Sequence, residues 1–260
     1  MIKFFRKIRQ RLLSENKFSK YLIYAIGEIV LVMIGILLAL QVNNWNNLRI
    51  EKSKEQAILK NLQIDFKNNI DNLDLAYNRF KEAYQASVML LEIIKDDKDI
   101  NPTEVEHLVN EIVNKPMSFD FITGSTNEII NTGSLHLIRD PALRKQISNW
   151  SYYFTDTQDD MVIYRDYLFG FFIPSLTTKV RLRNLSVPLI FEDDLDLQMI
   201  SNSGFKPDYN KAIKTFEFEN QVYNNALNYM WVINSYKVFQ NYLIDTLELI
   251  ETNINDITDS

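Results

Sequence analysis

The feature that most constrains this chain is an apolar stretch near its N-terminus, YLIYAIGEIVLVMIGILLALQV, which covers residues 21–42. Its 22 residues include a single charged side chain, Glu28. A helix rises about 1.5 Å per residue, so this stretch would extend roughly 33 Å across a hydrocarbon core that is roughly 30 Å thick. A buried helix of a soluble protein normally keeps a polar stripe, and this stretch has none. The pattern predicts one transmembrane helix over residues 21–42.

The charges that flank the stretch predict its orientation. Residues 1–20 carry seven basic side chains and one acidic one, whereas residues 43–57 carry three basic and two acidic ones. The more basic flank of a membrane span stays in the cytoplasm. Residues 1–20 are therefore predicted to be a basic cytoplasmic tail, and residues 43–260 an extracytoplasmic domain. The stretch is longer than the core of a signal peptide, about 7–15 residues, and no A-x-A site follows it, which favours a retained anchor over a cleaved leader. The tail contains Glu15 and seven basic residues, Lys3, Arg6, Lys7, Arg9, Arg11, Lys17 and Lys20.

One face of the predicted span could make a helix–helix contact in the membrane. Glu28, Gly35 and Ala39 are seven and four residues apart and share that face, and Gly27 and Gly35 allow close backbone approach. A carboxylate at this depth is costly unless it is neutral, paired or facing protein. Two interpretations stay open. Either Glu28 lies in a contact with a second copy or a membrane partner, or it is protonated or reaches the lipid headgroups.

The composition of residues 43–260 narrows the function of the external domain. These residues carry 32 acidic and 21 basic side chains, a net charge of −11. Nucleic-acid binding needs a basic footprint, so we expect no nucleic-acid partner, and the partners expected are membrane lipid and a second copy or another membrane protein. The chain has no cysteine, which excludes disulfides and thiolate metal sites. Glycine and proline occur only six times each, which favours long helices.

A first long helix is predicted to continue out of the membrane to about Asp97. No glycine or proline occurs between Ile36 and Asn101. Apolar side chains recur at spacings of three and four, which indicates one buried face. The predicted buried residues are Leu59, Leu62, Phe66, Ile70, Leu73, Tyr77, Phe80, Tyr84, Val88 and Leu91.

Two more long helices are predicted from N-cap residues and apolar spacing. Asp140 precedes Pro141, and Asp208 precedes a final segment without glycine or proline. The first is expected to kink or end near Pro174. Three helices with apolar faces cannot bury those faces alone, so we predict an all-α fold with an antiparallel bundle. The buried stripes are Leu143, Ile147, Trp150, Phe154, Thr157, Met161, Tyr164, Leu168 and Phe171, then Val222, Tyr229, Val232, Tyr236, Phe239, Leu243, Leu247 and Ile250.

Shorter segments are expected to cap this bundle. Two patterns are typical of capping boxes at helix starts, and Gly133 is typical of a helix C-terminus. Residues 185–207 are predicted to have no regular secondary structure, except that VPLIF (187–191) is predicted to be a short strand or a buried loop. The capping-box patterns are Thr103 with Glu106 and Ser125 with Glu128.

The run RKIRQRLLSENKFSKYLIYAIGEIVLVMIGILLALQVNNWN resembles the N-terminus of the Domain of Unknown Function 6090 (DUF6090) family of bacterial membrane proteins. STNEIINTGSLHLIRDPALRKQI is similar to the middle segment of that family. The resemblance implies a bacterial inner-membrane protein with one span and an external helical domain. It implies no activity, because the family has no assigned chemistry.

Residue types that carry chemistry are few. His107 shares a helix face with Glu104 and Glu111, but a two-metal bundle site needs paired E-x-x-H helices and only one such motif occurs, so a solvated face is the plainer interpretation. The acidic cluster Glu192, Asp193, Asp194 and Asp196 lacks the glycine of a calcium loop. We expect no catalytic residue, no metal site and no cofactor. If a ligand site exists, the segment Phe119–Gln146 is the candidate, with Asn127, Asn131, His136 and Arg139.

Two hypotheses for function follow, and neither is enzymatic. The first is a structural or interaction protein of the cell envelope, anchored in the inner membrane, which binds a second copy or another envelope protein. The alternative is a bundle that senses a ligand and passes a signal to a membrane partner. The alternative predicts a pocket lined by aromatic residues such as Trp150, Tyr164 and Trp231.

The orientation can be tested by moving charge across the span. Replacing the seven basic residues of the tail with glutamine, and adding lysines to residues 43–57, should invert or scramble the topology, because flanking lysine and arginine set it. Protease added to intact spheroplasts should digest residues 43–260 of the wild-type chain and spare those of the inverted variant. A wild-type domain that resists protease until the cells are lysed would contradict this orientation.

Overall fold

The fold is all-α, as the sequence predicted. The computed structural model describes residues 18–116, 119–185 and 200–258, and within these ranges it contains helices and no strand. The chain divides into two units, Met1–Gln56 and Ala57–Ser260. The elements in chain order are α2 (Phe18–Lys95), α3 (Pro102–Asn114), α4 (Gly124–Asn131), the 3₁₀ turn η1 (Ser134–Leu137), α5 (Pro141–Tyr167), the π-helical segment η2 (Leu168–Phe172), α6 (Ile173–Leu176), the 3₁₀ turn η3 (Leu182–Asn184), α7 (Tyr209–Ile213) and α8 (Phe216–Thr258).

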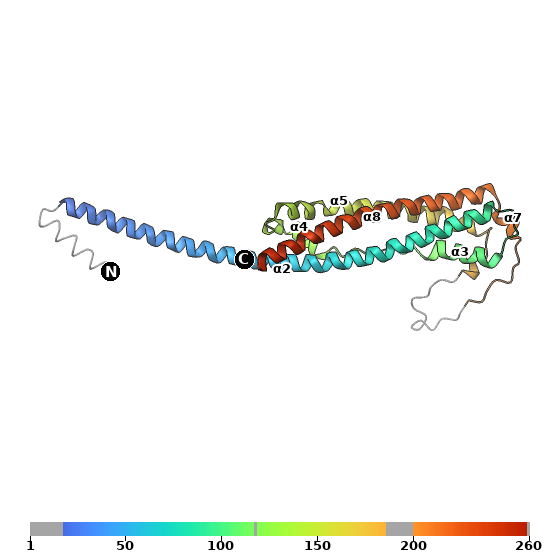
Figure 1. Ribbon diagram of the computed structural model, residues 1–260, viewed down its shortest axis with the longest axis horizontal. Coiled ribbons are helices and arrows are strands. Elements are labelled where there is room, and N and C mark those ends of the chain that lie inside the picture. Colours follow the sequence, from blue (N-terminus) through green and yellow to red (C-terminus); the bar gives the residue numbers. More distant parts are fainter. Residues whose placement is uncertain (1–17, 117–118, 186–199, 259–260) are drawn as a thin grey trace. The chain divides into compact units, whose positions relative to one another are not determined.

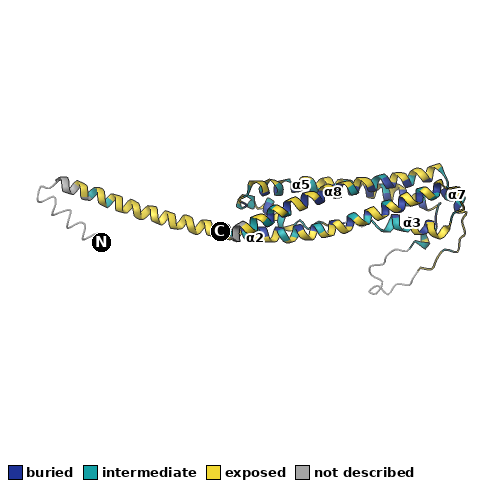
Figure 2. Cartoon of the chain, viewed as in Figure 1, coloured by how far each residue is buried: buried dark blue, intermediate teal, exposed yellow. Residues whose placement is uncertain are grey.

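The first unit contains the N-terminal part of α2, which is long and apolar enough to cross a membrane. None of its most apolar 18-residue window is buried inside the protein, and Figure 2 shows this part of the helix as almost wholly exposed. Trp45 follows the apolar stretch, with the Arg49 guanidinium 5.9 Å from its ring centre. Six of the seven basic tail residues lie outside the described residues, and the side chain of Lys20 is not described.

The second unit is a bundle in which α8 runs antiparallel to both α2 and α5 (Figure 1). Near one end of the bundle, the Gln63 side chain of α2 donates to Glu251 of α8 over 3.0 Å. Further along α2, the ring of Phe80 lies 5.9 Å from that of Tyr229. Phe80 also lies 5.1 Å from Tyr164 of α5, so the three helices share one core.

The chain from α3 to α4 forms a fourth layer along the bundle, whereas the sequence predicted only that the shorter segments cap it. The chain from α3 to α4 runs back along α2. Lys115 pairs with Glu82 at 2.8 Å, and Ser125 N donates to Asp65 at 3.1 Å. Between them the Asn69 amide exchanges two hydrogen bonds with the backbone of Ile122, 2.9 and 2.8 Å long. An asparagine offers both a donor and an acceptor, so it satisfies an extended backbone that lacks helical partners.

The buried seam of α2 departs from the predicted stripe beyond Phe66, where Ile70, Tyr77, Tyr84 and Leu91 are only half-buried. Val88 was predicted to be buried and is 40% exposed. The observed seam alternates spacings of three and four without a break, and several of its residues are small or polar, so an apolar pattern does not reveal them. Small side chains leave room for the large rings of α5 and α8. Beyond Phe66 the seam consists of Asn69, Leu73, Ala76, Phe80, Ala83, Ser87, Leu90 and Ile94.

The C-terminal end of α5 also departs from the prediction, because α5 is followed by the π-helical segment η2. Phe171 was expected in the core and is 68% exposed, whereas Phe172 is fully buried. A π-helical turn contains one more residue than an α-helical turn, so the buried position shifts by one. Pro174 is the second residue of α6, which follows this segment, and it has no N–H for the usual bond to residue 170. The helix ends at Leu176.

The caps of the helices were predicted correctly where an aspartate precedes the helix. Asp140 accepts from Ala142 N at the start of α5, and Gly133 is left-handed (φ 69°) after α4. Asp208 caps only the short α7, and the final segment breaks at Lys214–Thr215 before α8 begins. The stretch VPLIF and the acidic cluster Glu192, Asp193, Asp194 and Asp196 lie outside the described residues.

Both capping-box predictions are wrong. The N-cap of α3 is Asn101, whose side chain accepts from Thr103 N, and Glu106 points into the protein. The N-cap of α4 is Thr123, whose side chain makes no capping bond. There the first turn is capped by Asp65 of α2 through Ser125 N. A long-range partner has replaced the local one.

The shift at η2 makes a paired test of core packing. Phe172→Ala should lower the free energy of unfolding by about 3–5 kcal/mol, because it empties a filled core position. Phe171→Ala should lower it by less than about 1 kcal/mol, because the ring is exposed. Chemical denaturation of the detergent-purified chain, followed by circular dichroism, measures both values. Equal losses would show that the register of η2 is not the one described.

Candidate functional site

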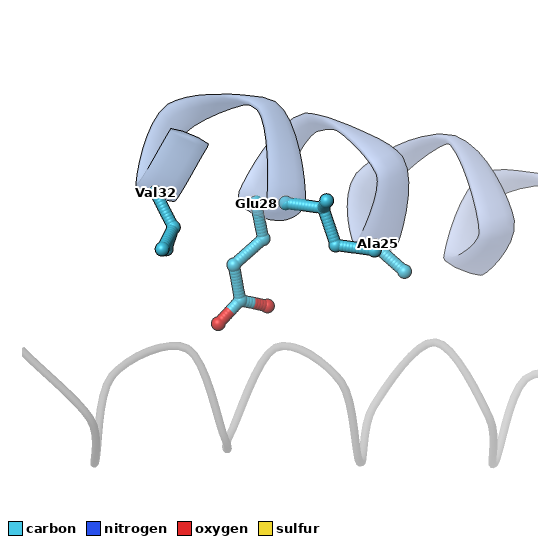
Figure 3. Close-up of a pocket in the computed structure, with 4 residues that line it drawn as sticks. Ala25, Glu28 and Val32 are labelled. Atoms are coloured by element: carbon cyan, nitrogen blue, oxygen red, sulfur yellow. The ribbon is translucent and has the colours of Figure 1, made fainter. Parts of the chain in front are cut away.

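The membrane face predicted around Glu28 lies on the exposed part of α2. Ala25, Glu28 and Val32 project from one side of the helix and line an open hollow together with Ile29 (Figure 3). Gly27, Gly35 and Ala39 are exposed, and a Cβ atom added to either glycine would meet nothing within 4 Å. Helical geometry places Gly35 and Ala39 on the side of Glu28 and Gly27 about a quarter turn away. Whether a second helix packs there stays a prediction.

The candidate ligand residues of Phe119–Gln146 do not converge in the structure. Asn127, Asn131, His136 and Arg139 are all exposed. His136 Nδ1 lies 2.8 Å from the carbonyl oxygen of Gly133, so its ring closes a local turn. The segment itself forms the end of the fourth layer and the start of α5.

The three residues of α3 that were considered as metal ligands, Glu104, His107 and Glu111, lie on a solvated helix face. His107 and Glu104 are exposed, and Glu111 pairs with Lys115 at 3.3 Å. Within the residues that the structure describes, no group of three or more histidine, aspartate or glutamate side chains is placed to hold a metal ion.

The aromatic residues proposed for a ligand pocket lie in two different environments. Trp150 is 1% exposed and is surrounded by the rings of Phe66, Phe154, Phe239 and Tyr242 at 5.5–6.4 Å. Tyr164 is 3% exposed, whereas Trp231 is 66% exposed on α8. The structure does not bring these three side chains together, which corrects the prediction of a pocket that they share.

Trp231 instead belongs to an uncharged surface that follows α8. Five of its large members, Phe216, Tyr223, Met230, Trp231 and Val238, are exposed to 45% or more, and Leu227 is half-buried. At 3.6 residues per turn, an arc of roughly 120° on the side opposite the core contains ten residues between Phe216 and Asn241. We call it the outward face of α8. It consists of Phe216, Asn220, Tyr223, Asn224, Leu227, Met230, Trp231, Asn234, Val238 and Asn241.

The absence of charge distinguishes this face from the rest of the domain. None of its ten residues is acidic or basic, although a quarter of the chain is charged. The nearest charged residues, Glu217, Glu219 and Lys237, lie at its borders. Aromatic residues and methionine are enriched at the centres of protein interfaces, where charges are depleted. The outward face of α8 therefore has the composition of an interaction surface.

A second cluster, which sequence reasoning missed, is built around Glu106 of α3. The Glu106 side chain is 10% exposed and accepts a 2.6 Å bond from Arg181 Nε and a 3.0 Å bond from Asn184. The Tyr209 hydroxyl donates to the same carboxylate. Burial opposes ionisation, but these hydrogen bonds outweigh it and hold the pKa of Glu106 below its ordinary value. One carboxylate thus joins α3 to two segments about 75 and 100 residues further along the chain.

The Glu106 cluster could not be found from local patterns. The partners of Glu106 lie 75 to 103 positions from it along the chain, and an isolated Glu in an amphipathic helix usually faces solvent. The one available signal was its position, because Glu106 lies beside Val105 and two residues before Leu108, on the apolar side of α3.

Comparison with known proteins finds a family model that matches residues 28–169, described as a family of unknown function (DUF6090). The matched range includes the apolar stretch from Glu28, the fourth layer and α5, and it covers more than half of the chain. No curated protein and no solved structure matches the chain.

The Glu106 cluster predicts a specific pH dependence of stability. Glu106→Gln should lower the free energy of unfolding at neutral pH by about 2–4 kcal/mol, because it leaves the largely buried Arg181 without its counter-ion. A lowered folded-state pKa stabilises the fold fully above the ordinary value of 4.5, and this stabilisation is lost as the pH falls through the lowered pKa. The difference between wild type and variant should therefore shrink below about pH 4.5. The exposed Glu104→Gln is the matched control, and a loss equal to that of Glu106→Gln would contradict the assignment.

Proposed function

The chain belongs to the DUF6090 family, whose function is unknown, and from its structure we propose that it is a single-span membrane anchor carrying an interaction domain. In this proposal residues 1–20 lie in the cytoplasm, and α2 crosses the bacterial inner membrane over residues 21–42. The bundle lies in the periplasm, where it associates with a second copy of the chain. The single observation that supports the association is the outward face of α8.

The charge distribution supports the proposed orientation. Seven basic residues precede the apolar stretch, whereas only three lie in residues 43–57 directly after it. The basic side of a single span is the cytoplasmic side. None of the most apolar 18-residue window of α2 is buried within the described chain. Lipid or another span would cover these apolar side chains.

We propose a binding role for the domain and no catalysis. The proposal draws on two clusters of described residues, an uncharged helix face and a carboxylate saturated by hydrogen bonds. The first suits a protein contact, and the second suits the fixing of a loop. Neither pairs a nucleophile with a base.

A second copy is the occupant that best fits the outward face of α8. A two-fold dimer brings a surface onto its own copy, so a charged side chain near the symmetry axis meets the same charge. For a domain with a net charge of −11, a charge-free surface is where two copies repel each other least. Asparagine side chains both donate and accept, so Asn234 can bond to its own copy. Trp231 and Tyr223 would supply the apolar area.

The dimer can be tested with a single engineered thiol, because the chain has no cysteine of its own. Asn234→Cys should form a covalent dimer when membranes are treated with a short bismaleimide. Adding Trp231→Glu should weaken the association at least tenfold, or about 1.4 kcal/mol, because each copy then presents a like charge to the other.

The matched control is Ile64→Cys, an apolar position on α2 that is 58% exposed. It should give no covalent dimer under the same conditions. If Asn234→Cys yields only monomer while Ile64→Cys yields dimer, the contact lies elsewhere on the bundle. A cross-link from Asn234→Cys to a different protein alone would replace self-association by a heterologous partner.

A further inference from the structure

The connection between α6 and α7 forms a basic cleft in this acidic domain. One wall is the segment Thr177–Arg183, and the other contains Ser203, Phe205 and Pro207. The cleft has a volume of about 340 Å³, which is within the usual range for a small-molecule site, roughly 300–1,000 Å³. Among its described lining residues three are basic, Lys179, Arg181 and Arg183, and none is acidic.

The two walls are held in place through Glu106. Arg181 and Asn184 of the first wall both bond to this carboxylate, and each also reaches the second wall. Arg181 Nη1 donates to the carbonyl oxygen of Phe205 over 3.2 Å, and Asn184 accepts from Ser203 N over 2.8 Å. The cleft is therefore a fixed part of the fold, and the charge of Arg181 is used in building it.

The other two cations lack a close counter-ion. The Lys179 side chain is 13% exposed, and its only ion pair in the described chain is to Glu217, 72% exposed and 3.8 Å away. Arg183 donates to Ser201 Oγ over a long 3.4 Å, and no carboxylate of the described residues pairs with it. The Ser203 hydroxyl accepts from Phe205 N over 3.3 Å and keeps its own proton to donate.

We propose that this cleft binds a doubly charged oxyanion of the phosphate class, held by Arg183, Lys179 and Ser203. Guanidinium groups match the geometry of phosphate oxygens, and an ammonium group adds a compact charge. A dianion would neutralise Lys179 and Arg183, which have no close carboxylate partner among the described residues. This site is separate from the outward face of α8, so it stands or falls independently of the proposed dimer.

Titration of the full-length, detergent-solubilised chain with inorganic phosphate by isothermal calorimetry tests the site. Binding should be saturable and should exceed that of chloride at the same ionic strength. Arg183→Gln should weaken it at least tenfold, and Ser203→Ala should weaken it less. Arg183 is exposed and holds no part of the core, so circular dichroism and the melting temperature should stay unchanged.

The matched control is Arg165→Gln, which removes the same charge from an exposed position on α5 and should leave binding unchanged. A short-chain phosphatidic acid in place of inorganic phosphate distinguishes a lipid headgroup from a free solute, and binding of either supports the site. No saturable binding of either probe would overturn the proposal. Equal losses in Arg183→Gln and Arg165→Gln would also overturn it, because they would indicate unspecific attraction.

Discussion

The rings of Phe80, Tyr164, Tyr229 and Tyr236 meet at one level of the bundle, and the register of its layers depends on this contact. Phe80 of α2 lies 5.1–5.9 Å from each of the three tyrosine rings, in edge-to-face geometry. The Tyr229 hydroxyl donates over 2.6 Å to the carbonyl oxygen of Ile112 in α3. These four side chains therefore link α2, α5, α8 and α3 at one level of the bundle. A slip of α8 by one turn would leave the buried Tyr229 hydroxyl without its partner, which is more costly than losing a neutral contact.

The sequence predicted what depends on local chemistry and on large apolar side chains. The Asp140-Pro141 helix start and the seam of α8 are such features, and both were found at the expected residues, with Leu247 of the seam half-buried. The second half of the α2 seam was not, because Ala76, Ala83 and Ser87 are buried by being small. The position of the fourth layer depends on Asn69 and Asp65, polar residues whose partners lie more than 50 positions away. Such pairings leave no periodic trace.

The candidate sites divide in the same way. The outward face of α8 was not predicted, because the apolar periodicity identifies the buried side of a helix and does not distinguish the opposite side from ordinary surface. Only the burial of each residue shows that the aromatic and aliphatic side chains there are exposed. The Glu106 cluster and the basic cleft require the tertiary fold, since they combine α3 with two segments that follow α6. In each case the chemistry resides in the placement of ordinary residues, and no short motif marks it.

The central carboxylate of the Glu106 cluster has an evolutionary consequence. Because Arg181 and Glu106 neutralise each other in a largely buried place, neither can be exchanged alone without leaving an isolated charge behind. Substitution at the two positions should therefore be concerted, with Tyr209 following because its hydroxyl serves the same carboxylate. Chains that descend from a common ancestor with this one should keep the trio or lose it together, and those that have lost it should have rebuilt the loop between α6 and α7.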